Sequence, residues 1–246
     1  MDTTLYVGLS HQVAMRRQMD IIANNIANVN TAAFKRESVM FREYIKDLEG
    51  NSTNALDKVA FVQDYGVHRR MTEGKLNVTD NPLDVAIGGD GLLVVERQDG
   101  SKAYTRNGHL QLSEDGILSS SSGHAILDNS GQKIQFPPET TNIKIAEDGS
   151  ISTKESGFVA RLDVVVFDDY SQLKKAGDSL YTTTEQPKPS ENYKIAQGLT
   201  ETSNVAPIVE IAAMINVSRS YMSMARTLEN LQKSQSQAIN RLANFS

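Results

Sequence analysis

Residues 207–246 read PIVEIAAMINVSRSYMSMARTLENLQKSQSQAINRLANFS, and no Gly or Pro occurs in the 39 residues that follow Pro207. Pro207 suits the first turn of a helix, where its missing N–H would have no partner. Two apolar seams follow at helical spacing: Ile208, Ile211, Ile215, Ser218, Met222 and Ala225, then Met224, Leu228, Leu231, Gln235, Ala238 and Leu242. The one-residue step between the seams predicts that the two halves of one long helix face different partners.

A second amphipathic helix is predicted near the other end of the chain, within residues 3–30. Its apolar stripe repeats at steps of four and three residues: Met15, Met19, Ile22, Ile26 and Val29. We interpret the two helices as an assembly module, whose interface comprises these five residues together with Ile211, Ile215, Met222, Leu228 and Leu231. The alternative is an intramolecular helical hairpin that simply covers a core.

The middle of the chain, about residues 65–200, has a different composition. Fifteen of the sixteen Gly and five of the six Pro lie between Gly50 and Gly198. Four dipeptides are typical of hairpin turns: Asp99-Gly100, Asn107-Gly108, Asp115-Gly116 and Asp148-Gly149. Val164–Phe167 is a continuous apolar run typical of a buried strand. This segment therefore predicts a compact all-β domain of many short strands.

A connection separates the first helix from the β domain. Within it, Phe34, Phe41, Ile45 and Leu48 have a spacing that predicts a short amphipathic helix. The expected fold class is therefore α+β, with paired terminal helices resembling a coiled coil, a central all-β domain and an extended linker. The expected divisions are an N-terminal helix in 1–33, a linker in 34–73, the β domain in 74–202 and a C-terminal helix in 203–246.

Composition and charge exclude several classes of function. The 246 residues contain no Cys, which excludes disulfides and thiolate metal sites. The net charge is −5, with −7 in residues 31–206, and this acidity argues against a nucleic-acid partner. No run of 18 apolar residues is present, so no membrane span is expected, and the first residues lack the pattern of a cleavable signal peptide.

No pattern of an enzyme emerges, and we expect no catalytic residue, no cofactor and no metal. Nucleophile elbow, phosphate loop, zinc spacing and dinucleotide fingerprint are all missing from the sequence. Asp168-Asp169 fits a solvated strand end better than a carboxylate pair. His109 and His124 are fifteen residues apart, and no carboxylate partner is identifiable for either.

Four blocks of sequence carry a resemblance to a known family. They are Asn24 to Lys35, Gly74 to Gly91 with its Asn-Pro-Leu-Asp, Tyr104 to Gly108, and the segment from Ser203 that opens the C-terminal helix. In this order they resemble the bacterial flagellar basal-body rod and hook family, most closely its proximal-rod members, with distal-rod members as the alternative. The signature residues are Asn24, Asn25, Asn28, Thr31, Phe34, Lys35, Asn81, Pro82, Leu83, Asp84, Ser203 and Asn204. Ala33 stands where the family usually has Gly.

The resemblance implies a structural subunit that self-assembles through its terminal helices into the tubular drive shaft between motor and hook. It implies other rod subunits and further copies of this chain as partners, and the flagellar type III export apparatus in transit. The implied location is the periplasmic rod of the basal body, reached without a cleavable signal peptide. A different hypothesis is a secreted β-rich binding module, which would need exposed aromatic residues among Tyr65, Tyr104, Tyr170, Tyr181 and Tyr193.

Overall fold

The computed structural model describes residues 2–47, 58–137, 140 and 142–243, and they divide into two compact units. Among these residues, we call 2–27, 37–47, 58–68 and 206–243 the helical unit, and 28–36, 69–137, 140 and 142–205 the β unit. The fold is α+β, with an N-terminal and a C-terminal helix packed together and a central domain rich in strands, as the sequence predicts.

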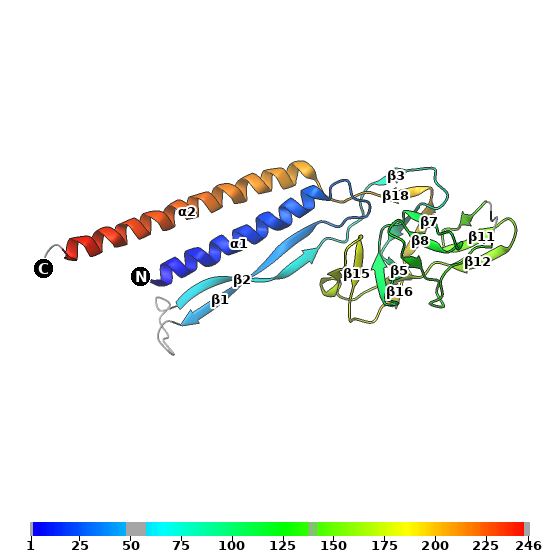
Figure 1. Ribbon diagram of the computed structural model, residues 1–246, viewed down its shortest axis with the longest axis horizontal. Coiled ribbons are helices and arrows are strands. Elements are labelled where there is room, and N and C mark those ends of the chain that lie inside the picture. The colour runs from blue at the N-terminus through cyan, green and yellow to red at the C-terminus, as the bar shows by residue number, and fades with distance from the viewer. Residues whose placement is uncertain (1, 48–57, 138–139, 141, 244–246) are drawn as a thin grey trace. The chain divides into compact units, whose positions relative to one another are not determined.

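The helical unit contains two helices and a two-stranded ribbon (Figure 1). Helix α1 spans Asp2–Ala27 and helix α2 spans Pro207–Ala243, and the two run side by side in opposite directions. Strands β1 (Glu37–Asp47) and β2 (Lys58–Arg69) pair with each other, and β1 lies along α1. Ala14, Ile21, Ile22 and Asn25 of α1 are buried. Helix α1 is therefore covered by α2 on one face and by the ribbon on another.

The predicted amphipathic helix in the connection is wrong. Phe41 and Ile45 lie in strand β1, where both are exposed, and Leu48 lies outside the described residues. Spacing of four residues suits a helical face, and residues 41–45 of β1 are all exposed, so this part of the strand shows no alternation between buried and exposed positions. The pairing of β1 with β2 decides between the two conformations, and that pairing is not local in sequence.

The β unit is built from short strands in several sheets. The largest has nine strands, with the order β14-β15-β6-β5-β9-β8-β7, and β13 pairs with both β5 and β16. Its strands are β5 (Leu92–Glu96), β6 (Lys102–Thr105), β7 (Leu110–Leu112), β8 (Leu118–Ser120), β9 (Ala125–Ile126), β13 (Val164–Val166), β14 (Lys174–Lys175), β15 (Leu180–Thr182) and β16 (Lys188–Pro189). Strand β5 lies near the centre of this sheet.

Three smaller sheets complete the β unit. Strands β10 (Lys144–Ile145), β11 (Ser150–Thr153) and β12 (Gly157–Arg161) form one, β4 (Val85–Gly89) pairs with β17 (Tyr193–Gln197), and β3 (Leu76–Val78) pairs with β18 (Leu199–Glu201). A 3-10 turn, η2, spans Tyr170–Gln172. The pairing of β4 with β17 and of β3 with β18 joins the beginning of the unit to its end.

The core of the β unit lies on both faces of the large sheet. Leu93 and Val95 of β5 enter one apolar cluster, and Leu92 and Val94 enter the other. Since consecutive side chains of a strand point to opposite faces, the continuous apolar run of β5 marks a strand that is buried on both sides. The predicted strand near Val164 is confirmed as β13 and pairs directly with β5.

Three of the four predicted hairpin dipeptides form tight turns. Gly100, Gly116 and Gly149 have left-handed backbones, with φ of 78°, 74° and 82°. The prediction for Asn107-Gly108 is wrong, because β6 pairs with β5 and β15 while β7 pairs with β8. Gly108 is needed for another reason: a Cβ there would overlap the carbonyl oxygen of Val85.

Replacing Gly108 by Ala should lower the free energy of unfolding of the β unit by about 3 kcal/mol or more, because strand β4 would have to move away. Gly100→Ala is the matched control, since a Cβ there meets nothing within 4 Å and only the left-handed backbone opposes it, at about 1 kcal/mol. Urea unfolding followed by tyrosine fluorescence would measure both. Equal losses for the two variants would contradict the steric argument.

Candidate functional site

The predicted interface residues of α1 are largely covered within the helical unit. Ile22 is buried, and Met15, Met19 and Ile26 are half-buried. Val29 follows the end of α1 and belongs to the β unit, where it is half-buried. Sequence reasoning missed Ile21, which is as buried as Ile22, because α1 packs against two neighbours and therefore uses a wider apolar face than one stripe.

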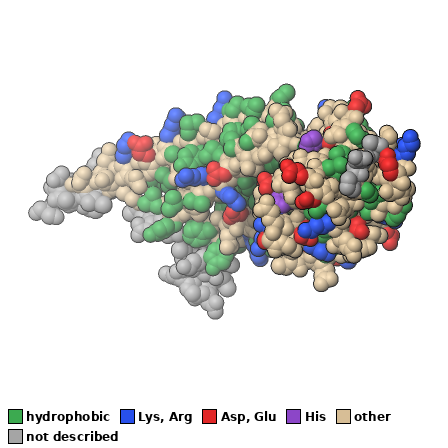
Figure 2. Space-filling view, turned by 45° about the vertical axis from the view of Figure 1, so that its right-hand side comes forward, with side chains coloured by type: hydrophobic (Ala, Val, Ile, Leu, Met, Phe, Trp, Pro, Cys, Tyr) green, Lys and Arg blue, Asp and Glu red, His purple; other side chains and the backbone are tan. Residues whose placement is uncertain are grey.

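The two seams of α2 lie on different faces of the helix. Leu228 and Leu231 of the second seam are half-buried, and Leu228 lies against Gly8 of α1. The four large residues of the first seam are exposed: Ile208, Ile211, Ile215 and Met222 have exposed fractions of 81%, 49%, 46% and 48%. We call these four residues the exposed stripe. Figure 2 shows hydrophobic side chains gathered over the helical unit.

A buried amide joins three elements of the helical unit. The side chain of Asn25, fully buried, donates from Nδ2 to the Glu37 carbonyl at 2.8 Å and accepts from the Glu37 N–H at 3.0 Å. The same Nδ2 donates to Oε2 of Glu210, in the first turn of α2, at 3.2 Å. Asn25 therefore fixes the start of β1 and the start of α2 against the end of α1. Glu210 was not among the predicted site residues, although it is fully buried.

The other signature residues near α1 shape the entry into the β unit. Asn24 is exposed, and Thr31 donates to Oδ1 of Asn28 at 3.1 Å. Ala33 adopts a left-handed backbone with φ of 55°, which Gly would adopt without strain, and its N–H donates to the Glu201 carbonyl at 2.8 Å. Phe34 is buried, with Nζ of Lys175 4.4 Å from its ring centre.

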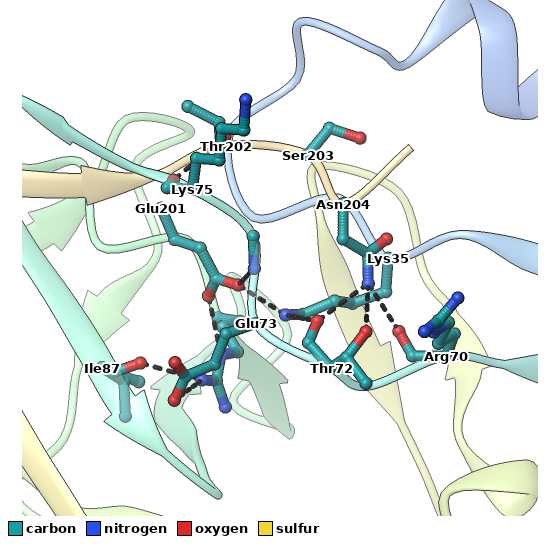
Figure 3. Close-up of polar contacts among 12 residues, drawn as sticks. Lys35, Arg70, Thr72, Glu73, Lys75, Ile87, Glu201, Thr202, Ser203 and Asn204 are labelled. Atoms are coloured by element: carbon teal, nitrogen blue, oxygen red, sulfur yellow. Dashed lines mark hydrogen bonds and ion pairs between the residues drawn. The ribbon is translucent and has the colours of Figure 1, made fainter. Parts of the chain in front are cut away.

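A buried cluster of charges ties together segments that are distant in sequence (Figure 3). Nζ of Lys35 donates to Oε1 of Glu201 at 2.6 Å, and Nε of Arg106 donates to Oε2 at 2.8 Å. The N–H of Gly74 also donates to Oε1, at 2.6 Å. We call Lys35, Arg106 and Glu201 the charge cluster. All three side chains are at most 2% exposed.

The remaining donors of the charge cluster find backbone acceptors. Lys35 also donates to the Thr72 carbonyl at 3.0 Å. The Arg106 guanidinium donates to the carbonyls of Gly91, Ile87 and Gly89 at 2.9, 2.8 and 2.7 Å. Buried charges are tolerated when they are paired and hydrogen-bonded, and this cluster meets that condition.

The cluster shifts the acid–base behaviour of its members. Burial alone would raise the pKa of Glu201, but Arg106 and Lys35 outweigh it and hold the pKa below its ordinary value. Burial is also the largest influence on Lys35, and it lowers the pKa of that amine despite the attraction of Glu201. Glu201 is therefore the stable anion between two cations.

Asn204 joins the same segments through neutral hydrogen bonds (Figure 3). Its Oδ1 accepts from the Arg36 N–H at 2.7 Å, and its Nδ2 donates to the carbonyls of Arg70 and Thr72, each at 2.8 Å. Its neighbour Ser203 is buried and accepts from the Val205 N–H at 3.3 Å. The signature residues Lys35 and Asn204 thus lie at one junction of the β unit.

The Asn-Pro-Leu-Asp block forms a second polar junction in the β unit. Asn81 accepts from the Leu83 N–H and donates to Oδ1 of Asp84, both at 3.2 Å, and the Pro82 carbonyl accepts from Gln197 at 2.7 Å. The buried Asp84 lies 2.7 Å from Nδ1 of His109. The expectation that neither histidine has a carboxylate partner is therefore wrong: Asp84 faces His109, and Asp178 lies 3.6 Å from Nε2 of His124. These partners are 25 and 54 residues away, beyond what spacing reveals.

The side chains of these polar junctions bond mainly to backbone groups and to one another. Within the described part of the chain, no group of three or more His, Cys, Asp or Glu side chains could hold a metal ion. Neither described helix combines the length and the apolarity that a bilayer crossing requires. The polar junctions hold backbone segments in place, and the exposed stripe is an apolar surface of the helical unit.

Glu201→Gln should lower the free energy of unfolding at pH 7 by about 3–5 kcal/mol, since Lys35 and Arg106 would remain buried without their anion. A carboxyl with a lowered pKa contributes stability above its unfolded pKa, and this contribution is lost as pH falls through the lower folded pKa. The difference between native and variant chains should therefore be constant near neutral pH and shrink below about pH 4.5. Urea titrations from pH 7 to pH 3 would measure it, and a difference that grew on acidification would contradict the assignment.

Asn25→Asp should destabilise the helical unit by about 3 kcal/mol or more, because a buried carboxylate would face Glu210 and lose the donor to the Glu37 carbonyl. Asn24→Asp is the matched control: the same change, one residue earlier, at an exposed position. Thermal unfolding followed by circular dichroism at 222 nm would compare them. Similar melting shifts for both variants would show that the Asn25 amide has no special role.

Comparison with known proteins agrees with this architecture. Residues 5–35 match the model of the flagella basal body rod protein family, residues 86–153 match the D1 domain of flagellar hook proteins FlgE, FlgF and FlgG, and residues 196–242 match the C-terminal region of the basal body rod FlgEFG proteins. These segments contain α1, the centre of the β unit and α2.

Full-length relatives extend the match. The chain is 39% identical over 248 residues to the flagellar basal-body rod protein FlgF of Caulobacter vibrioides, with 98% of each chain covered. It is 32% identical over 249 residues to FlgF of Mesorhizobium japonicum, with both chains covered in full. It is 33% identical to the rod protein FlgG of Buchnera aphidicola subsp. Acyrthosiphon pisum, covering 89% of this chain and 91% of that one. With both terminal helices and the β unit matched, the chain belongs to the flagellar basal-body rod protein family.

Proposed function

We propose that this chain, a structural subunit of the flagellar basal-body rod, joins the rod through the exposed stripe of α2. The observation that carries the proposal is the set of four large apolar side chains that α1 leaves uncovered. A solvated face of a helix normally carries polar residues, and contiguous apolar surface marks an interaction site. The partners in this proposal are other rod subunits and further copies of this chain.

The proposal extends to location and transit. The relatives are named as basal-body rod proteins, and this supports a place for the chain in the periplasmic rod. We include passage through the flagellar type III export apparatus, without a cleavable signal, as part of the proposal. The role is structural, with no catalytic step assigned to the chain.

The binding-module hypothesis finds little support in the tyrosines. Tyr104 and Tyr181 are buried in the second apolar cluster, and Tyr170 is partly buried against it. Tyr193 is half-buried, and Tyr65, the exposed member of the set, lies in β2 of the helical unit. The β unit therefore lacks a cluster of exposed tyrosines among its described residues, and stacking on a glycan would need such a cluster.

Ile211→Glu should abolish incorporation into the rod and swimming, because a carboxylate would be placed in the apolar contact. The isolated chain should melt within about 2 °C of the native chain, since a substitution at a half-exposed site changes stability by about 0.5 kcal/mol or less. The matched control is Ser220→Glu, at an exposed position on the side of α2 opposite Ile211. It should leave both rod incorporation and the melting temperature unchanged. Complementation of a strain that lacks the native chain, with blotting of purified basal bodies, measures incorporation. Normal rods from Ile211→Glu would refute the proposal.

A further inference from the structure

The helical unit has an apolar groove where the start of α1 meets the second half of α2. The groove has a volume of about 470 Å³ and is lined by Leu5, Tyr6, Leu9, Gln12, Ala225, Leu228, Glu229 and Gln232. Tyr6 and Leu9 are 62% and 53% exposed. Gly8 lies against Leu228, and a Cβ on Gly8 would come within 2.5 Å of Leu228 Cδ2, so the missing side chain lets the two helices approach here. Among the residues that the structure describes, no side chain fills this apolar groove.

The exposed stripe lies at the other end of the helix pair from the groove. The stripe is centred near residue 215 of α2 and the groove near residue 228, a separation of about 20 Å along the helix axis. Both features sit on one continuous helix, so the stripe of a chain cannot enter the groove of that same chain. As far as the described residues go, the stripe and the groove are therefore left to other molecules.

Shape and charge of the two features are complementary. The stripe is a convex row of three isoleucines and one methionine, and the groove is a concave surface between two helices. Two exposed arginines, Arg219 and Arg226, border the stripe. The groove lining includes Glu229 and no Lys or Arg. Glu229 lies 2.7 Å from Lys233 in the helical unit, in an exposed pair of the kind that rearranges at little cost.

We propose that the groove of one copy of this chain binds the exposed stripe of a second copy, with Arg219 of the second copy beside Glu229 of the first. This inference rests on the proposed function and names the partner of the same stripe. The two surfaces are different, so the contact is heterologous: each copy offers a stripe to one neighbour and a groove to another. Such a contact repeats in an open series, with successive copies displaced by about 20 Å along the helix axis.

Single-cysteine variants test the contact directly, because the chain has no cysteine of its own. Leu9→Cys places a thiol in the groove and Ile211→Cys places one on the stripe. Both variants, one of them tagged, are expressed together in a strain that lacks the native chain and are treated with a short bismaleimide in swimming cells. We expect a cross-linked dimer that contains one copy of each variant, and none when either variant is expressed alone. Ser220→Cys paired with Leu9→Cys is the matched control and should give none.

The possible outcomes distinguish failure of this contact from failure of the proposed function. A dimer from Ile211→Cys alone would show that two stripes meet each other and would overturn the proposal, as would loss of the mixed dimer in cells that swim. In the second case the chain is in the rod, so the proposed function survives. If the cysteine variants do not swim, charge exchange decides: Arg219→Glu should impair swimming and Arg219→Glu with Glu229→Arg should restore it. Failure of that restoration would overturn the contact.

Discussion

The carboxylate of Glu201 is the interaction on which the β unit's entering and leaving segments depend. The carboxylate accepts hydrogen bonds from Lys35 in residues 28–36, from the N–H of Gly74 in the segment before β3, and from Arg106 in the loop after β6. Three charged side chains without solvent are costly unless each is paired, so a segment that slipped by one residue would leave a buried charge without its partner. The cluster thus selects one arrangement of these segments more than it adds net stability. Gly74 is part of the same constraint, because a Cβ there would overlap the Thr202 carbonyl.

In the helical unit, the alignment of the segments is fixed by the neutral side-chain amide of Asn25. Asn25 meets Glu210 near one end of the helix pair, and Gly8 meets Leu228 toward the other. These contacts are 17 residues apart on α1 and 18 on α2, as expected for two antiparallel helices with equal rise. A buried amide with satisfied donors and acceptor fixes axial register, whereas apolar seams alone tolerate a shift by one heptad. Asn25 and Gly8 therefore determine which residues of α2 are not covered by α1 and stay exposed.

Sequence alone predicted the parts of this fold that are encoded locally. The absence of Gly and Pro defined α2, and Asp-Gly dipeptides located three turns of the β unit. The ribbon was missed because Phe41 and Ile45 repeat at four residues, and the exposed positions 41–45 have no alternation that would indicate a strand instead. At the candidate site, Lys35 and Asn204 were identified by resemblance, but their roles were not. Their partners depend on the folded chain: Glu201 is 166 residues from Lys35, and no periodicity connects them.

The exposed stripe has a strength suited to assembly rather than to dimerisation. Burying four large apolar side chains, each already about half-covered or less, is worth at most about 2 kcal/mol per residue, or about 8 kcal/mol in all. Loss of translational and rotational freedom on association costs about 4–15 kcal/mol. One such contact therefore roughly balances its own cost, and a subunit becomes stably held only when several neighbours bind it at once. The proposed contact therefore predicts that free chains remain separate, while a growing end that presents several contacts together captures them, because the cost of immobilisation is met once for all the contacts.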